Sequence, residues 1–265
     1  MSVAAAGFDD LTIGEDNNTM TMLKELVRKA LPRRVFDAGK RLWLSREASA
    51  LRDRCAAETS IEGKIDRVLD SNYFRPDQKK FEIAKLLHLL QTRQPHVLAE
   101  IGGRIGGSLA LFAQVAAPDA RILSVDLEYK PGQKEALSAF ARASQSITCV
   151  AADSHAPATL AMVQTWLRGA KFDFLLIDGD HSMSGVKSDY VMYSPLVKPG
   201  GIIAFHDIVP DSRTRHGIKT ASDVGEVPAF WRSLKEQGLT VEEYVESWEQ
   251  DGFGIGVVHW DGRAS

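Results

Sequence analysis

The chain has 265 residues, of which 44% are hydrophobic and 25% are charged. These values are typical of globular proteins and exclude a wholly disordered, collagen-like or coiled-coil chain. A formal net charge of −3 gives no strong field of either sign, so nucleic acid is not expected as a partner.

The charges are unevenly distributed along the chain. Residues 1–19 carry four acids and no base, whereas the ten bases and four acids of residues 20–54 give that segment a charge of +6. Residues 55–265 therefore carry −5. We expect an acidic flexible tail over 1–19, followed by a basic extension over 20–77.

Cys55 and Cys149 are the only cysteines, too few for a disulfide framework and wrongly spaced for a zinc knuckle. No apolar run reaches the roughly 18 residues that a membrane span needs. The first residues lack the basic flank and apolar core of a signal peptide. These features predict a cytoplasmic protein without a transmembrane segment.

Residues 20–51 show two apolar stripes at helical spacing, separated at Pro32. A further helix is expected after Asp77, its N-cap, with Phe81, Ala84, Leu87 and Leu90 on one face. Basic amphipathic helices can lie on anionic membranes or can pack on the core or on a second subunit. We favour packing, and expect a homo-oligomer, while peripheral membrane contact stays open.

From Pro95 onward, short apolar runs alternate with helical segments. Strands are expected over 96–101, 121–126, 147–151, 172–178 and 201–205, and helices over 107–117, 132–143, 156–168 and 184–196. Alternating strands and helices imply right-handed crossovers and a parallel sheet covered on both faces. The fold class is α/β.

The end of the chain has a different pattern. A helix near 226–237 precedes two strand-like runs, 239–245 and 253–260, and the turn signal Asp251-Gly252 lies between them. This pattern predicts an antiparallel hairpin. We therefore expect one catalytic domain over 78–265.

A glycine-rich segment, Glu100 to Ser108, lies where the first expected strand meets its helix. A P-loop would need lysine where Ser108 stands, and a dinucleotide fingerprint would need two glycines separated by one residue. A carboxylate at Glu100 would repel a pyrophosphate and attract a cationic amino group. The remaining alternative is a tight turn that binds no ligand.

Two further acids follow the next strands. Asp126 ends the second strand, where a carboxylate can accept ribose hydroxyls, and Asp153 ends the third, beside the place of an adenine. Each alone could be a helix cap. Together with the glycine loop they describe a nucleoside that carries an amino-acid tail, which fits S-adenosylmethionine better than NAD or ATP.

Three motifs in this order resemble the seven-stranded class I methyltransferases, and more narrowly the group of macrocin and rhamnosyl O-methyltransferases and cephalosporin hydroxylase-like proteins. They span residues 100–108, 174–181 and 196–207, and the likeness extends from about Gln78 to Trp260. The resemblance implies strand order 3-2-1-4-5-7-6 with strand 7 antiparallel. It implies that Glu100, Gly102, Gly106, Ser108, Asp126, Asp153 and Asp178 bind S-adenosylmethionine.

A second cluster follows the fourth and fifth strands: Asp178, Asp180 and His181, then His206 and Asp207. A sugar or phenol hydroxyl is protonated at neutral pH, so its methylation needs a base or a metal ion. Oxygen ligands on adjacent strand ends suit Mg²⁺. In similar metal-dependent O-methyltransferases, ligands occupy the places of Asp178 and of the pair His206-Asp207.

This chain departs from those relatives, which carry Glu-Asp or Asp-Asn where His206-Asp207 stands. Histidine shifts such a site toward Mn²⁺, Fe²⁺ or Zn²⁺, or acts as a base without metal. We therefore predict Asp178, His206 and Asp207 as metal ligands and Asp178, His181 and His206 as catalytic residues. A structural role for His206 and an ordinary loop position for His181 stay open.

The sequence thus predicts an S-adenosylmethionine-dependent O-methyltransferase that acts, with Mg²⁺ or another divalent ion, on a hydroxyl of a small or glycosylated metabolite, a sugar in the first place. N-methylation of an amino sugar and a non-catalytic protein with the cofactor fold are the alternatives.

Overall fold

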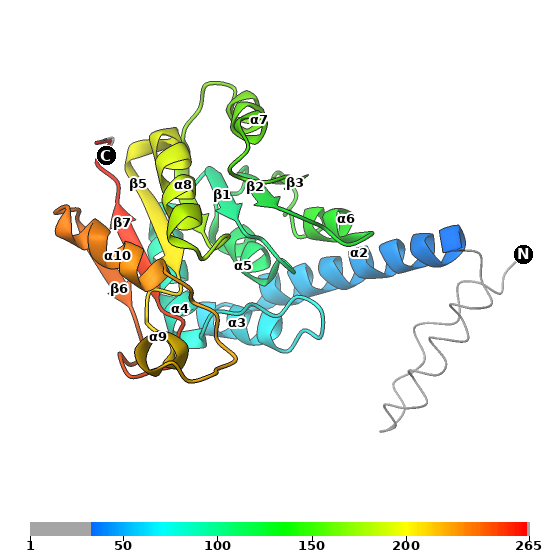
Figure 1. Cartoon of the computed structure of the whole chain (residues 1–265). Helices are drawn as coiled ribbons and strands as arrows, with labels where there is room; N and C mark the ends of the chain where they lie inside the picture. Colours follow the sequence, from blue (N-terminus) through cyan, green and yellow to red (C-terminus); the bar gives the residue numbers. More distant parts are fainter. Residues whose placement is uncertain (1–32, 264–265) are drawn as a thin grey trace, which may run out of the picture.

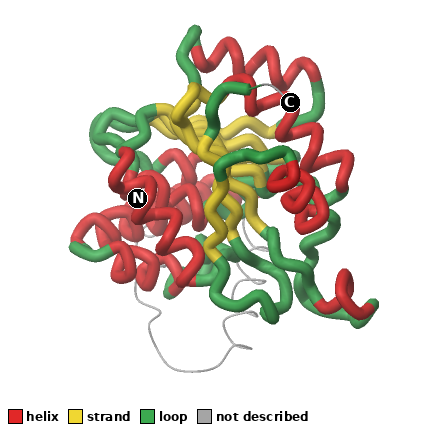
Figure 2. The backbone as a smooth tube through the Cα atoms, turned by 90° about the vertical axis from the view of Figure 1, so that its left-hand side faces the viewer, coloured by secondary structure: helices red, strands yellow, loops and turns green. Residues whose placement is uncertain are grey.

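The computed structural model describes residues 33–263, which form a seven-stranded sheet between two layers of helices (Figures 1 and 2). The N-terminal helices are α2 (Arg33–Ala57), α3 (Ile61–Leu69) and α4 (Lys80–Arg93). Then follow β1 (Val97–Ile101), α5 (Gly107–Val115), β2 (Arg121–Asp126), α6 (Gln133–Ser138), β3 (Ser146–Ala151) and α7 (Pro157–Leu167). The last part holds β4 (Phe172–Ile177), α8 (Met183–Tyr193), the 3-10 turn η1 (Ser194–Leu196), β5 (Val197–His206), α9 (Ser212–His216), α10 (Val227–Glu236), β6 (Val241–Tyr244) and β7 (Ile255–His259).

The strand order is β3-β2-β1-β4-β5-β7-β6. β1 to β5 run parallel, whereas β7 pairs antiparallel with both β5 and β6. The α/β class, the strand order and the closing hairpin predicted from the sequence are therefore confirmed. The part of the predicted N-terminal helix over 20–32, together with the acidic tail, lies outside the described residues.

Two apolar clusters form the core, one on each face of the sheet. In β4, Phe174 and Leu176 belong to the cluster under α2 to α6, while Leu175 and Ile177 belong to the cluster under α7, α8 and α10. Successive side chains of a strand point to opposite faces. An unbroken apolar strand such as β4 can therefore be buried only between two helical layers.

The N-terminal helices extend the first of these layers. Ala48 and Leu51 of α2 and Ile65 of α3 are fully buried in the same cluster as residues of α5 and α6. The Arg52 guanidinium donates a hydrogen bond of 3.1 Å to the carbonyl of Ala139. The described part of the basic extension therefore packs on the sheet-covering helices, although the far end of α2 projects from the body (Figure 1).

Local features differ from the sequence-based expectation in several places, of which three bear on the site and its surroundings. Lys79, not Asp77, is the N-cap of α4, because Asp77 instead pairs with Arg104. α3 was not predicted; Ser60 caps it by accepting a hydrogen bond from the Gly63 N–H at 3.0 Å. α6 is half the expected length and ends at Ser138.

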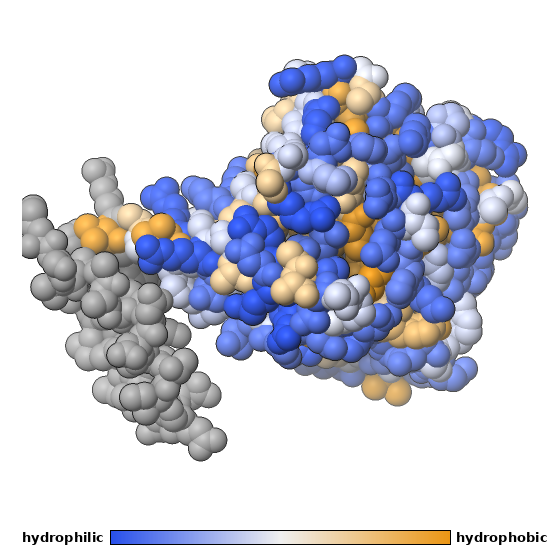
Figure 3. Space-filling model, turned by 180° about the vertical axis from the view of Figure 1, so that it is seen from behind, coloured by the Kyte–Doolittle hydropathy of each residue, from blue (hydrophilic) through white to orange (hydrophobic). Residues whose placement is uncertain are grey.

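Seen from behind, hydrophilic residues cover most of the surface and apolar residues show between them (Figure 3). Within residues 33–263, no helix is both long and apolar enough to span a membrane.

Phe174 provides a test of this core. Its fully buried ring packs edge-on against Phe112 with ring centroids 5.1 Å apart. Phe174→Ala removes these contacts and leaves a cavity, so we expect a loss of about 3–5 kcal/mol in the free energy of unfolding, measured in urea. Val191→Ala, at a half-exposed position of α8, should cost less than about 0.5 kcal/mol; equal losses in the two variants would contradict the assigned core.

Candidate active site

A crevice is expected at the carboxyl ends of β1 and β4, where the order of the strands reverses. β1 pairs with β2 on one side and with β4 on the other. The helices after these strands cover opposite faces, since α5 contributes to one apolar cluster and α8 to the other. Loops that diverge in this way leave room for a ligand, and the predicted site residues all lie in or beside the loops at this edge.

The glycine loop, residues 102–107, is pressed against the end of β4. A side chain at Gly102, where φ is +87°, would collide with the Asp178 carbonyl. Gly106 also has a positive φ, +84°, and forms the N-cap of α5. Glycine is required at both positions because other residues rarely adopt this conformation. The loop thus brings its backbone close to the Asp178 segment.

Glu100, at the base of this loop, is completely buried. One carboxyl oxygen accepts a hydrogen bond from the Ser108 hydroxyl, and the other, Oε2, has no partner among residues 33–263. Burial, with the nearby Asp178 and Asp126 adding to it, raises the pKa of Glu100 to about 8. A buried acceptor without a donor fits a ligand that brings a cationic group.

Asp126 and Asp153 follow β2 and β3 at the same edge. The Asp126 carboxylate accepts hydrogen bonds from the backbone N–H groups of Arg104, at 2.7 Å, and of Glu128, at 3.1 Å. Asp153 accepts one from the N–H of His155 at 2.9 Å. Both acids therefore organise their own loops, and their contact with a nucleoside stays a prediction.

The second predicted cluster converges in space. Nδ1 of His206 lies 3.2 Å from Oδ1 of Asp178 and 3.5 Å from Oδ2 of Asp207. His181 approaches the same two carboxylates, with Nε2 3.5 Å from Asp178 and Nδ1 3.7 Å from Asp207. Asp180 instead accepts the backbone N–H of Ser182 at 2.8 Å. The four converging residues come from the adjacent ends of β4 and β5.

The cluster is an electrostatically coupled unit. Burial by itself would raise the pKa of Asp178, but the charge of His206 and the hydrogen bonds to His206 and His181 lower it to about 2. Contact with Asp178 raises the pKa of His181 to about 9 against the effect of burial. Burial would lower the pKa of His206, but Asp178 and Asp207 outweigh it and raise this pKa to about 9 as well. The buried carboxylates therefore hold positive charge beside them.

Three of these residues offer atoms suited to a divalent ion. Asp178, His181 and Asp207 each present one ligand atom, and these atoms all lie within 4.8 Å of one another. This set contains His181, which the sequence suggested as a base and not as a ligand. Ligation by His206 stays a prediction; its Nε2 is buried and has no hydrogen-bond partner in the described part of the chain.

Gln78, which the sequence did not suggest, also reaches the cluster. Its Nε2 donates a hydrogen bond of 3.1 Å to Oδ2 of Asp178, and its Oε1 is buried without a partner within residues 33–263. The segment around it is anchored by the ion pair of Asp77 with Arg104 in the glycine loop. No spacing signal could have found Gln78, because one hundred residues separate it from Asp178.

Glu82 is a second residue that the sequence did not suggest. It is fully buried on α4 and accepts hydrogen bonds from Nε2 of Gln250, at 2.6 Å, and from the N–H of Gly254, at 2.9 Å. The adjacent N–H of Phe253 donates to Oδ1 of Asp207 at 3.0 Å. Glu82 therefore fixes the β6–β7 loop that orients Asp207.

Comparison with known proteins relates part of the chain to methyltransferases. Residues 99–208 match a family described as "Methyltransferase domain". Rhamnosyl O-methyltransferase from Mycobacterium bovis (strain BCG / Pasteur 1173P2) is 30% identical over 124 residues, which are 45% of this chain and 48% of the relative. The chain thus spans about half the length of the curated relatives it matches.

Solved structures share the fold. An O-methyltransferase from Bacillus cereus, in complex with SAH, superimposes with a TM-score of 0.54 over 83% of this chain and 99% of its own, at 15% identity. The MycE methyltransferase of the mycinamycin pathway, in complex with Mg, SAH and mycinamycin VI, gives a TM-score of 0.52 over 79% of this chain and 56% of its own, at 18% identity. Residues 99–208 therefore match a methyltransferase domain, and the chain shares the fold of solved methyltransferases.

Proposed function

We propose that this protein transfers the methyl group of S-adenosylmethionine to a hydroxyl of a small or glycosylated metabolite, a sugar in the first place, and that a divalent ion assists. One observation carries the proposal: two carboxylates and two histidines converge at the ends of β4 and β5, directly beside the glycine loop. The relative from Mycobacterium bovis is a rhamnosyl O-methyltransferase, which supports a sugar as the acceptor.

The residues present fit the cofactor. Oε2 of Glu100 and Oε1 of Gln78 are buried acceptors without donors within residues 33–263. A ligand with a cationic amino-acid tail would supply donors to such atoms, whereas a pyrophosphate would add negative charge beside a carboxyl group. When bound, the cofactor supplies an electrophilic methyl group on a positively charged sulfur.

The reaction breaks the bond between that methyl carbon and sulfur, forms a carbon–oxygen bond and releases the hydroxyl proton. The acceptor must therefore lose a proton as its oxygen approaches the methyl group in line. His181 and His206, on either side of Asp178, would receive it only in their neutral form, and because their pKa is about 9 this form increases as the pH rises toward 9. Asp178 orients both rings and would stabilise the positive charge that a protonated histidine carries.

The cluster also fits a divalent ion. Asp178, Asp207 and His181 would hold it through two carboxylate oxygens and one imidazole nitrogen. There it would lower the pKa of an acceptor hydroxyl, so that the hydroxyl loses its proton near neutral pH. The MycE structure, which has the same fold, contains Mg, and this supports the involvement of a divalent ion.

A screen of labelled methyl transfer tests the function directly. We expect label to pass from S-adenosylmethionine to hydroxylated glycosides or phenols in the presence of Mg²⁺ or Mn²⁺, and the rate to fall at least about tenfold in EDTA. Transfer to amino sugars alone would point to N-methylation. Cofactor binding without transfer to any acceptor of the panel would favour a binding protein.

Asp178→Ala separates chemistry from cofactor binding. Because Asp178 orients both histidines and would ligate the ion, we expect its loss to lower kcat by about 100-fold or more. The Kd of S-adenosylmethionine, measured by calorimetry, should change far less than kcat, although the resemblance also implies that Asp178 contacts the cofactor. Asp119→Ala is the matched control, since Asp119 is exposed at the opposite edge of the sheet, where it pairs with His96. A normal kcat for Asp178→Ala would contradict the mechanism.

The raised pKa of Glu100 predicts that cofactor binding releases a proton. With a pKa of about 8, its carboxyl group is mainly protonated at pH 7 in the free protein. A cationic group beside it lowers this pKa, so binding should release close to one proton. Calorimetry at pH 7 in buffers of different ionisation enthalpy measures this number, which should fall toward zero above about pH 9 because Glu100 is then already ionised.

Glu100→Gln provides the control for this measurement, because glutamine keeps the shape of the side chain and cannot titrate. We expect it to bind the cofactor more weakly and without the release. An unchanged release in Glu100→Gln would show that the proton comes from another group.

A further inference from the structure

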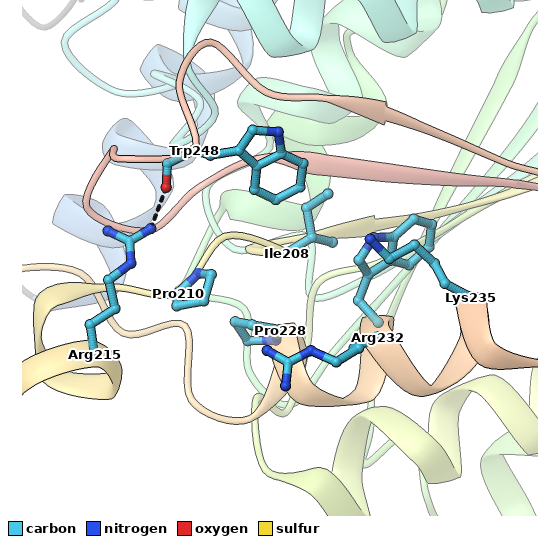
Figure 4. Close-up of a pocket in the computed structure, with 8 residues that line it drawn as sticks. Ile208, Pro210, Arg215, Pro228, Arg232, Lys235 and Trp248 are labelled. Atoms are coloured by element: carbon cyan, nitrogen blue, oxygen red, sulfur yellow. Dashed lines mark hydrogen bonds between the residues drawn. The ribbon is translucent and has the colours of Figure 1, made fainter.

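A pocket lies beside the loop that follows Asp207, on the side of the sheet that carries β7. It is bounded by the loop after β5, by α9, by α10 and by the β6–β7 loop, and has a volume of about 260 Å³. Figure 4 shows Trp248 on one side and Pro228 and Arg232 on the other, with Ile208 between them. We call it the Trp248 pocket.

Its position relates it to the acceptor and not to the cofactor. Ile208 directly follows Asp207 in the chain, so the pocket shares the loop that begins at the reaction centre. In the sheet, β5 and β7 lie on the opposite side of β4 from β1, whose end carries the glycine loop. A molecule with its hydroxyl at Asp178 and Asp207 could extend in this direction without meeting the cofactor's binding residues.

The pocket combines a broad apolar surface with positive charge. The Trp248 side chain is 50% exposed, whereas Ile208 and Pro228 are buried in the floor and wall. Three cationic residues, Arg215, Arg232 and Lys235, line the pocket, and no acidic residue does. An aromatic face beside positive charge favours an anionic ligand that also carries a ring.

The three cations are not equivalent. The Arg215 guanidinium donates hydrogen bonds to the backbone carbonyls of Trp248, at 2.6 Å, and of Gln250, at 2.8 Å, and so builds the wall (Figure 4). Lys235 donates to Oε1 of Glu243 at 2.7 Å. Arg232 makes no hydrogen bond or ion pair with any residue of 33–263, and it is exposed. Its guanidinium is therefore free to bind an anion.

The local structure presents Arg232 toward the pocket. Pro228, Arg232 and Lys235 are spaced four and three residues apart on α10, so they follow one another along one side of the helix. The buried Phe230, Trp231 and Leu234 hold the helix on the sheet. Arg232 thus projects from a fixed element.

We infer that the Trp248 pocket binds an anionic group of the methyl acceptor, a carboxylate or a phosphate ester, with Arg232 as its partner and Trp248 against the adjoining ring. The inference rests on the proposed methyl transfer and narrows its substrate class to acidic glycosides or phosphorylated metabolites. Two N–H groups of a guanidinium can bind either anion in a planar, bidentate manner.

Binding to the full chain, saturated with S-adenosylhomocysteine, tests the inference by calorimetry. Phenyl glucuronide and phenyl phosphate are the anionic probes, and phenyl glucoside is the neutral counterpart of the glucuronide. We expect at least one anionic probe to bind about tenfold more tightly than the glucoside. The preferred anion distinguishes a carboxylate site from a phosphate site. Equal binding of all three probes would overturn the inference.

Variants test whether the tighter binding of the anionic probes arises in the Trp248 pocket. Arg232→Ala should abolish the difference in affinity between anionic and neutral probes, and Arg232→Lys should keep part of it. Arg93→Ala removes an exposed arginine at the end of α4 and should leave the difference unchanged. Trp248→Ala should weaken all ring-bearing probes, while Trp248→Phe should restore them. The inference would be overturned if Arg232→Ala still bound the anionic probes more tightly than the glucoside. It would also be overturned if only Trp248→Ala lost affinity for the probes, because that result indicates an apolar subsite.

Methyl transfer on the same panel separates this inference from the proposed function. Transfer to the neutral glycoside with an unchanged KM in Arg232→Ala, and no anion preference, would support the function and reject the pocket. Anion binding that depends on Arg232, together with no transfer to any acceptor, would support the pocket as an anion site and reject the methyltransferase activity on such acceptors.

Discussion

The buried carboxylate of Asp178 is the interaction on which the rest of the site depends. A buried anion is costly unless positive charge lies beside it, and here His181, His206 and the amide of Gln78 surround it. Asp207 adds a second carboxylate to the same space. The pair therefore needs cations, which protonated histidines supply in the absence of an ion. A divalent ion would supply the same charge, and this equivalence links the electrostatics of the cluster to the proposed chemistry.

The contribution of the N-terminal third to this site follows from packing. The turn before α4 contacts the glycine loop through Asp77 and Arg104, and α4 holds the β6–β7 loop through Glu82. Gln78 and Glu82 are thus four residues apart in the chain but reach two different parts of the site, Asp178 and the loop that orients Asp207. The sequence predicts that the catalytic domain begins at residue 78. The residues that support the site, Asp77, Gln78 and Glu82, lie at that boundary.

The proposed division of the carboxyl edge assigns each ligand to one side of β4. The glycine loop and Glu100 lie on the side of β1 and would hold the cofactor, while the Trp248 pocket lies on the side of β7 and would hold the remote part of the acceptor. The reacting groups would then meet over the ends of β4 and β5. The loop of the closing antiparallel hairpin supplies Trp248 and also the N–H of Phe253 that orients Asp207.

The sequence by itself determined the alternation of strands and helices, the closing hairpin and the clustering of Glu100, Asp178 and Asp207 at strand ends, because apolar periodicity and the position of a residue after a strand are local properties. It could not reveal Gln78 or Glu82. Their roles depend on which distant loop packs against α4, and the free energy that decides this comes from buried area shared by segments far apart in the chain. Asp77 shows the same limit: its type suits an N-cap, yet a tertiary ion pair with Arg104 determined its position.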